Sequence, residues 1–285
     1  VDEMIYVVVR ASNDGENKGT KSAFNAVDPY TLLVSFEENV DFAEVEPNDE
    51  FSKATSLTPN GFREGFHSPK GDVDYFRIDS DEPILLKLQL TGVDQIDFVL
   101  SIVQVEGESK EIILLQANEG AAKEPAQLNS VSCHGTCYVK VDSVTRKVDG
   151  KITKDDQNSE LPYRLSASVI VDDGSEEREP NQTSSTSTQI SLGRPMRGTI
   201  FPKKDVDYFR LDLTSKPVKT PLRATLTGIL KVDVGLYLYR QEADGDLTLV
   251  QTSDGSKGEK TEKITYAAEP AIYFFLVRDS KQREG

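Results

Sequence analysis

The chain has few of the residues on which enzymes, nucleic-acid binders and membrane proteins usually depend. Its 285 residues include no Trp, two His, two Cys and two Met. The 33 Lys and Arg stand against 48 Asp and Glu, giving a net charge of −15. The basic residues form no cluster, which argues against nucleic acid or an anionic membrane as partner. No apolar run of about 18 residues could form a transmembrane segment. We therefore expect a folded, secreted, β-rich protein.

A repeated pair of motifs divides the chain. Glu46-Pro47-Asn48 is followed by the segment Gly-Asp-Val-Asp-Tyr-Phe-Arg at 71–77, and Glu179-Pro180-Asn181 is followed by Lys-Asp-Val-Asp-Tyr-Phe-Arg at 204–210. Asp72 follows Pro47 by 25 residues, as Asp205 follows Pro180. The two copies are separated by about the length of a domain, which indicates tandem modules that each bury their own core.

Alternating and β-branched runs predict strands throughout both copies. In residues 162–169 the side chains of Tyr163, Leu165, Ala167 and Val169 fall on one face of a strand that would close the first module. Long helical periodicity is absent from the sequence. We therefore predict an all-β fold of tandem β-sandwiches: 1–41 as the closing strands of a preceding or swapped module, 42–173 as a complete module, and 174–285 as a module lacking its last strand.

The amino-terminal segment resembles the closing part of a module. Its Pro-Tyr-Thr-Leu-Leu-Val run at 29–34 matches the Pro-Tyr-Arg-Leu run at 162–165. The order of tail, complete module and truncated module favours a fragment of a longer tandem array, mature or trimmed if it is exported. Alternatively, the amino-terminal segment completes the second module, within one molecule or across molecules by strand addition.

The two cysteines lie close together at Cys133 and Cys137, with Gly135 between them. A disulfide between them is the expected state. So short a loop removes little chain entropy, on the order of 2 kcal/mol, so the bond would fix a hairpin and would not hold the fold together. The alternative is two thiols in a reducing compartment. A zinc site lacks ligands, because one neighbouring histidine and two cysteines do not make four.

The motifs of both copies resemble those of the bacterial pre-peptidase C-terminal domain, which begins with Glu-Pro-Asn-Asp and carries a later Gly-Asp-x-Asp-Tyr-Phe strand. The resemblance covers residues 44–285 and extends to the collagen-binding domains of clostridial collagenases. It implies a jelly-roll-like sandwich attached to bacterial secreted proteases and surface proteins, acting in secretion, substrate binding or spacing. The collagen-binding relatives bind calcium through their amino-terminal linker.

Residues of the first copy could supply such a calcium site. Calcium takes about six to eight oxygen ligands, and the candidates are Glu44, Glu46, Asn48, Asp49, Asp72 and Asp74. Strand alternation predicts that Asp72 and Asp74 share the outer face while Val73 and Tyr75 face the core.

The second copy offers a weaker site made of Glu177, Glu179, Asn181, Asp205 and Asp207. Gln182 replaces Asp49 there, and Arg178 stands among the carboxylates. In the alternative reading of both copies, Asp72 and Asp205 only form turns, the asparagines bond to the backbone and the glutamates are solvated.

Catalysis has little support. We expect His67 and His134 to be loop or surface residues, and no nucleophile elbow, phosphate-binding glycine loop or zinc-protease motif is present. We expect a protein that is not an enzyme. Tyr237 and Tyr239 fall on one face of a predicted strand and are the candidates for a binding surface.

Three function classes remain. The first is a noncatalytic module, secreted or at the bacterial cell surface or in the periplasm, that acts in adhesion by binding an extracellular polymer or surface protein. The second is a structural spacer or strand-complemented filament subunit. The third is a secretion or substrate-binding appendage of a secreted protease. Binding to a polymer would favour the first class, self-association by strand addition the second, and a protease sequence upstream the third.

Overall fold

The computed structural model describes residue 32 and residues 42–281, except 108–109, 119–121, 149–150, 217 and 256–259. The strands predicted within residues 1–41 lie outside this range. From Phe42 onward the chain forms one compact unit. Within the described residues the only helical element is the three-residue 3-10 turn η1 (Phe51–Lys53), so the prediction of an all-β fold is confirmed. No helix in this part of the chain is long and apolar enough to cross a membrane.

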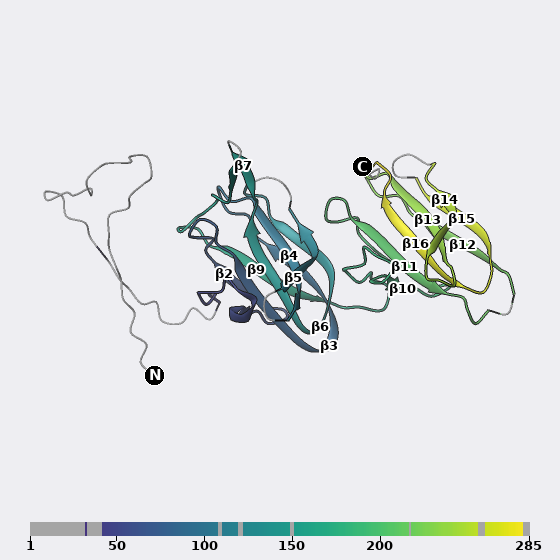
Figure 1. The fold of residues 1–285 in the computed structure, drawn as a ribbon, viewed down its shortest axis with the longest axis horizontal. Coiled ribbons are helices and arrows are strands. Elements are labelled where there is room, and N and C mark those ends of the chain that lie inside the picture. The colour runs from purple at the N-terminus through teal and green to yellow at the C-terminus, as the bar shows by residue number, and fades with distance from the viewer. Residues whose placement is uncertain are drawn as a thin grey trace. The chain divides into compact units, whose positions relative to one another are not determined.

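The first module is built around one sheet (Figure 1). Its strands pair in the order β2-β9-β3-β6-β4-β5, and β1 joins β3 in parallel. A separate hairpin consists of β7 and β8. The strands are β1 (Thr55–Ser56), β2 (Phe62–Gly65), β3 (Asp74–Leu90), β4 (Phe98–Glu106), β5 (Lys110–Ala117), β6 (Ala126–Ser143), β7 (Arg146–Val148), β8 (Lys151–Thr153) and β9 (Tyr163–Ile170).

Two long strands, β3 and β6, give this sheet its sandwich character. The β3–β6 register shifts between Ser80 and Ile84, and different neighbours continue the sheet on the two sides of that shift. The second half of β3 pairs with β9, whereas the second half of β6 pairs with β4. Phe76 from one half of β3 and Leu88 from the other belong to the same buried cluster, so the sheet folds over a single core.

The second module divides the same elements between two sheets. One sheet has the order β10-β11-β16-β13-β14, and the other pairs β12 with β15. Both sheets contribute to one core, in which Leu211, Leu222 and Tyr273 are buried. The strands are β10 (Thr188–Gln189), β11 (Val206–Asp212), β12 (Thr220–Leu226), β13 (Val234–Gln241), β14 (Leu247–Ser253), β15 (Glu262–Ala268) and β16 (Ile272–Asp279).

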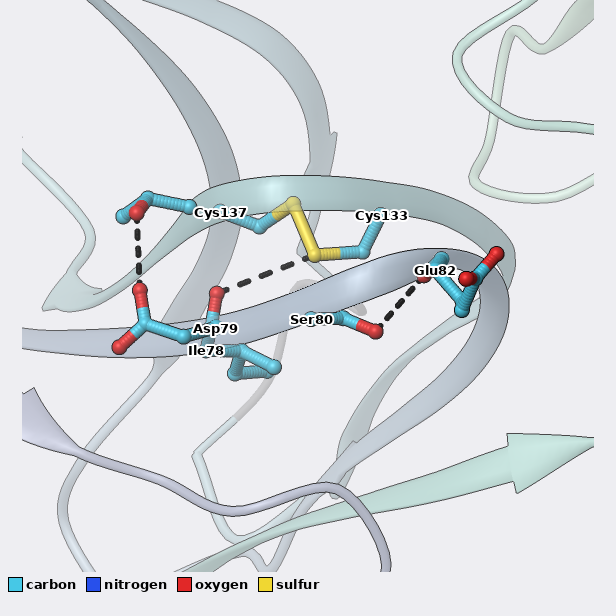
Figure 2. The surroundings of a disulfide bond; sticks show 7 residues. Ile78, Asp79, Ser80, Glu82, Cys133 and Cys137 are labelled. Atoms are coloured by element: carbon cyan, nitrogen blue, oxygen red, sulfur yellow. Dashed lines mark hydrogen bonds between the residues drawn. A yellow bond between two sulfur atoms is a disulfide. The ribbon is translucent and has the colours of Figure 1, made fainter.

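Different bonds stabilise the corner of each module, which is the point where the chain passes from one half of the sandwich to the other. In the first, Cys133 and Cys137 form a disulfide where β6 bends, and Gly135 between them has a φ of 73° that favours glycine. Figure 2 shows the bridge beside β3, to which Thr136 adds a hydrogen bond of 2.8 Å to Asp79. In the second module the chain breaks into β15 and β16 at this corner.

A tyrosine replaces the bridge in the second module. Tyr273 takes the place of Cys137 in the repeat, and its hydroxyl accepts a hydrogen bond from the Glu269 amide at 3.0 Å and donates one to the Glu269 carbonyl at 3.1 Å. Glu269 corresponds to Cys133. A pair of hydrogen bonds therefore joins the two positions that a covalent bond joins in the first module.

Candidate cation sites

Backbone hydrogen bonds hold the linker before the first module against two strands. The Glu44 amide donates to the Glu64 carbonyl of β2 at 2.8 Å, and the Asn48 carbonyl accepts from the Tyr75 amide of β3 at 3.0 Å. The linker side chains are thereby carried to the start of β3, where Asp74 lies.

Oxygen atoms converge at this point. Ligand oxygens of Glu44, Glu46 and Asp74 all lie within 4.8 Å of one another. The side-chain amide of Asn48, with its nitrogen toward the carboxylates, donates to Glu46 Oε2 at 2.8 Å and to Asp74 Oδ1 at 3.2 Å. One amide cannot pair with all of these carboxylate oxygens, and they repel one another unless a proton or a cation lies between them.

Burial raises the free energy of the ionised carboxylates in this cluster. Asp74 is fully buried, and its Oδ2 has no hydrogen-bond donor among the described residues. Burial raises the pKa of Asp74 to about 9, and the charge of Glu44 adds to the shift. Burial also raises the pKa of Glu44 itself. A bound cation would reverse these shifts because it stabilises the carboxylates.

The predicted orientation of the aspartates was wrong for Asp74. Phe76 and Ile78, which alternate with it along β3, lie in the core, so Asp74 faces inward with them. Tyr75 is on the opposite face, where its hydroxyl donates to Glu111. The reason is that the linker covers the start of β3, which makes an inward position there available to polar groups.

The other two candidates of the first copy have different positions. Asp72 accepts hydrogen bonds from the Ser68 amide at 2.6 Å and the Val73 amide at 3.1 Å, as the turn alternative predicted. Asp49 is exposed and is not among the converging carboxylates. The structure therefore places Glu44, Glu46, Asn48 and Asp74 together.

Sequence reasoning missed His67. It is fully buried, packs its ring edge-to-face on Phe98 at 5.7 Å, and lies with Asp72 and Asp74 as a second group of three ligand atoms within 4.8 Å. Burial lowers its pKa. The expectation of a loop or surface residue is wrong for His67 but holds for His134, which is exposed. The apolar neighbour Phe66 and the nearby turn gave no sign of this burial.

The second copy builds the same cluster with deeper burial. Glu177, Glu179 and Asp207 have ligand oxygens within 4.8 Å of one another, and each is at most 2% exposed. Glu177 Oε2, Glu179 Oε1 and Asp207 Oδ1 find no donor among the described residues. Burial, followed by neighbouring carboxylate charges for Glu179 and Asp207, raises the pKa of Glu177 to about 7, of Glu179 to about 8 and of Asp207 to about 10.

The neighbours of the second cluster explain why it need not behave like the first. Gln182, which replaces Asp49, donates to Glu179 Oε2 at 2.7 Å and to Asp205 Oδ1 at 3.3 Å. Asp205 also accepts from the Phe201 and Val206 amides, which makes it a turn residue like Asp72. Arg178 does not stand among the carboxylates of the cluster, because its guanidinium donates to Asp172. The alternative of solvated glutamates does not hold for Glu177 and Glu179.

The tyrosines proposed as a binding surface lie in β13, between β14 and β16. Tyr237 is 9% exposed, its hydroxyl donates to Asp254 at 2.8 Å, and Arg278 covers its ring at 4.9 Å. Tyr239 is half-buried. Tyr237 therefore offers little ring area to a ligand, and a role for Tyr239 stays a prediction.

Two solved structures are similar to this chain at low sequence identity. The structure matches the pre-peptidase C-terminal domain of a collagenase from Bacillus anthracis with 12% identity and a TM-score of 0.29, over 43% of this chain and 98% of that domain. It also matches the PBSX exported protein XepA with 9% identity and a TM-score of 0.22, over 97% of this chain and 99% of that one. No family model and no curated protein matches the sequence. The first of these structures has the family name of the domain whose motifs the sequence resembles.

Proposed function

We propose that this chain is a noncatalytic extracellular β-sandwich repeat in which calcium at the linker clusters stiffens each module for binding to an extracellular polymer or surface protein. The observation that supports it is the repeated convergence of linker carboxylates on a buried aspartate, Asp74 in one copy and Asp207 in the other. Burying a carboxylate costs its solvation free energy, so an aspartate that is buried in both copies needs a bound partner that offsets this cost.

The chemistry of the donors favours calcium. The clusters built around Glu44 and Glu177 consist of carboxylate oxygens, which are ligands of hard cations. The unpaired oxygens Asp74 Oδ2 and Asp207 Oδ1 supply negative charge that no donor in the described structure satisfies. Calcium tolerates the irregular geometry that a linker and a strand end provide better than magnesium, which requires near-octahedral coordination.

A noncatalytic role is supported by the surroundings of the histidines. Neither ring nitrogen of the buried His67 has a hydrogen-bond partner among the described residues, so no acid orients it and no nucleophile is activated by it. The exposed His134 lies beside the disulfide-bonded Cys133. A disulfide also fits an oxidising compartment outside the cytoplasm.

The second cluster also ties the linker to the first module. The Glu179 amide donates to the Ser130 carbonyl and its carbonyl accepts from the Ser132 amide, both at 2.8 Å. Glu179 therefore belongs to a cation cluster and to an edge contact of β6. A cation that fixes its side chain would also restrain the connection between the two modules.

Calorimetry of the full chain tests the cation. Calcium at one hundred times its dissociation constant should stabilise the module that binds it by about 2.7 kcal/mol relative to chelator. Asp74→Asn should remove this response in the first module, yet raise the melting temperature in chelator, because it removes the free-energy cost of protonating Asp74 when the chain folds at neutral pH. Asp49→Asn, at an exposed position outside the cluster, is the matched control and should keep the response. If Asp74→Asn melts at a lower temperature than the wild type when both are measured in chelator, the result would count against a cation site.

Solid-phase binding tests the recognition role. The full chain, with calcium and with chelator, is applied to fibrillar collagen, chitin and peptidoglycan. Saturable binding to one polymer in calcium, weakened by chelator, supports a binding module. Binding to none of them while the calcium response is intact favours a structural spacer.

A further inference from the structure

An apolar groove of about 290 Å³ lies open in the second module. Its lining includes Phe209 and Phe275, most of the segment 190–198 and the residues 222–226 of β12. Within the described residues β12 pairs only with β15, so its other edge has unpaired backbone groups. An unpaired edge beside an apolar groove is the usual acceptor of an added strand.

The first module shows what occupies the equivalent position. There β9 lies between β2 and the second half of β3, and its Tyr163, Leu165 and Ala167 are at most 1% exposed. Leu88 and Leu90 of β3, which pair with residues of β9, are also at most 1% exposed. Their counterparts in β12 are only half-buried; they are Ala224 and Leu226. The groove of the second module therefore corresponds to the space that β9 fills.

Two buried oxygens near the groove lack a hydrogen-bond donor among the described residues. In the first module the Tyr163 hydroxyl of β9 donates to Glu44 Oε2 at 2.8 Å. The corresponding oxygen, Glu177 Oε2, has no donor among the described residues, and neither has Oδ1 of Asp207, which lines the groove. A Cβ on Gly198, which is also in the lining, would lie 2.3 Å from Glu177 Oε2, so that oxygen lies directly behind the lining at Gly198. A tyrosine hydroxyl on an added strand would satisfy it.

The chain contains a segment with the required pattern. Aligned on Pro-Tyr-x-Leu, residues 29–36 place Tyr30 at the position of Tyr163, Leu32 at that of Leu165 and Val34 at that of Ala167. Thr31 then corresponds to Arg164, which points outward and is exposed. Every inward position of the segment is apolar or carries the tyrosine hydroxyl.

We propose that the second module is a strand acceptor, and that residues 29–36 of a second copy of the chain insert beside β12 as the counterpart of β9. Only five residues separate this segment from Phe42, and five extended residues span at most about 18 Å. The segment is thus tethered at the start of the first module, and Tyr30 precedes Glu46 by 16 residues, as Tyr163 precedes Glu179. A second module of another copy that accepts this segment would therefore continue the tandem order that the chain itself has from its first module to its second. Repeated donation produces head-to-tail chains.

Sedimentation velocity of the full 285-residue chain tests this inference. The expected result is concentration-dependent formation of dimers and longer chains. Leu32→Asp should weaken this association about a hundredfold, because it puts a charge at a fully buried position. Thr31→Asp, the matched control, places the same charge at the exposed position and should leave association unchanged. A synthetic peptide of residues 28–37 should dissociate the chains, and a scrambled peptide should not.

A self-complemented chain gives a second control that does not alter any native residue. Fusing a copy of residues 144–171 after Gly285 supplies a covalent β9 to the groove, and the fused chain should be monomeric at all concentrations. The proposal is overturned if the 285-residue chain is monomeric throughout. If the chain is monomeric and Leu32→Asp melts at a lower temperature than the wild type, residues 29–36 insert into the groove of their own chain. If the melting temperature is unchanged, residues 29–36 do not occupy the groove.

Discussion

The two modules share their central sheet and their acid cluster but differ in how they are closed. The parallel pairing of β1 with β3 matches Thr55 with Phe76, and that of β10 with β11 matches Thr188 with Phe209, at corresponding positions of the repeat. The first module adds β9 and a disulfide, whereas in the second, among the residues that the structure describes, β12 pairs only with β15 and a tyrosine lies at the corner. The acid cluster therefore forms both in the module that has β9 and the disulfide and in the module that has neither among the described residues.

The largest effect is expected from weakening the closing strand of the first module. Leu165→Ala removes a side chain that is fully buried in the core beside β3. The loss of buried area and the cavity left behind should cost about 2–5 kcal/mol of unfolding free energy. Urea denaturation followed by calorimetry should assign the loss to one of two transitions.

Ser168→Ala is the control for this experiment, since Ser168 is an exposed residue of the same strand. It should shift neither transition by more than about 0.5 kcal/mol. If Leu165→Ala lowers both transitions equally, the modules do not unfold as separate units and the comparison between them fails.

The next effect concerns pH, and it should be stronger in the more deeply buried second cluster. Below about pH 4 the carboxyls are protonated in both the folded and unfolded states. As pH rises, the unfolded chain releases these protons while the folded chain retains them, because the folded pKa values are about 7 for Glu177, 8 for Glu179 and 10 for Asp207. Folding then binds protons, so stability in chelator should fall from pH 5 to pH 8.

Calcium should reduce or reverse this fall, since the cation replaces the protons on the same oxygens. The measurement is the melting temperature of each transition at half-unit pH steps, in chelator and in saturating calcium. A chelated protein whose stability rises between pH 5 and pH 8 would show that these carboxyls are ionised without a cation, and would contradict the buried-cluster account.

A smaller effect is expected from opening the corner of the first module. Replacing both Cys133 and Cys137 with serine removes a loop constraint worth about 2 kcal/mol. The first transition should fall by that amount while the second stays unchanged. Reduction of the wild-type disulfide should give the same shift, and no shift after complete reduction would mean that the bond adds nothing to stability.

The sequence was sufficient for the repeat, the all-β class and the grouping of Glu44, Glu46 and Asn48 with Asp74, because these follow from motif spacing and ligand type. It was not sufficient for orientation. Asp74 continues the inward face of Phe76, since the folded linker, and not solvent, covers the end of β3. A period of two along a strand cannot show which face a linker will cover.

Long-range packing also decided the features that sequence reasoning missed. His67 is buried because Phe98, 31 residues further along the chain, packs against its ring. Arg178 leaves the second cluster because Asp172 accepts its hydrogen bond before the module begins. Neither neighbour is indicated by the local pattern around the repeated motif, in which Arg178 replaces the Val45 of the first copy.

The smallest predicted effect compares the tyrosine corner with the disulfide. Tyr273→Phe keeps the buried ring and deletes the hydroxyl that bonds to the Glu269 amide and carbonyl, which should cost about 1 kcal/mol in the second transition. Tyr266→Phe is the control, because Tyr266 packs edge-to-face on the same ring at 6.1 Å but makes none of these corner bonds. If Tyr273→Phe destabilises the second module as much as the double serine variant destabilises the first, two hydrogen bonds hold this corner as firmly as the covalent bond. If it has no effect, the break between β15 and β16 is stable by packing alone.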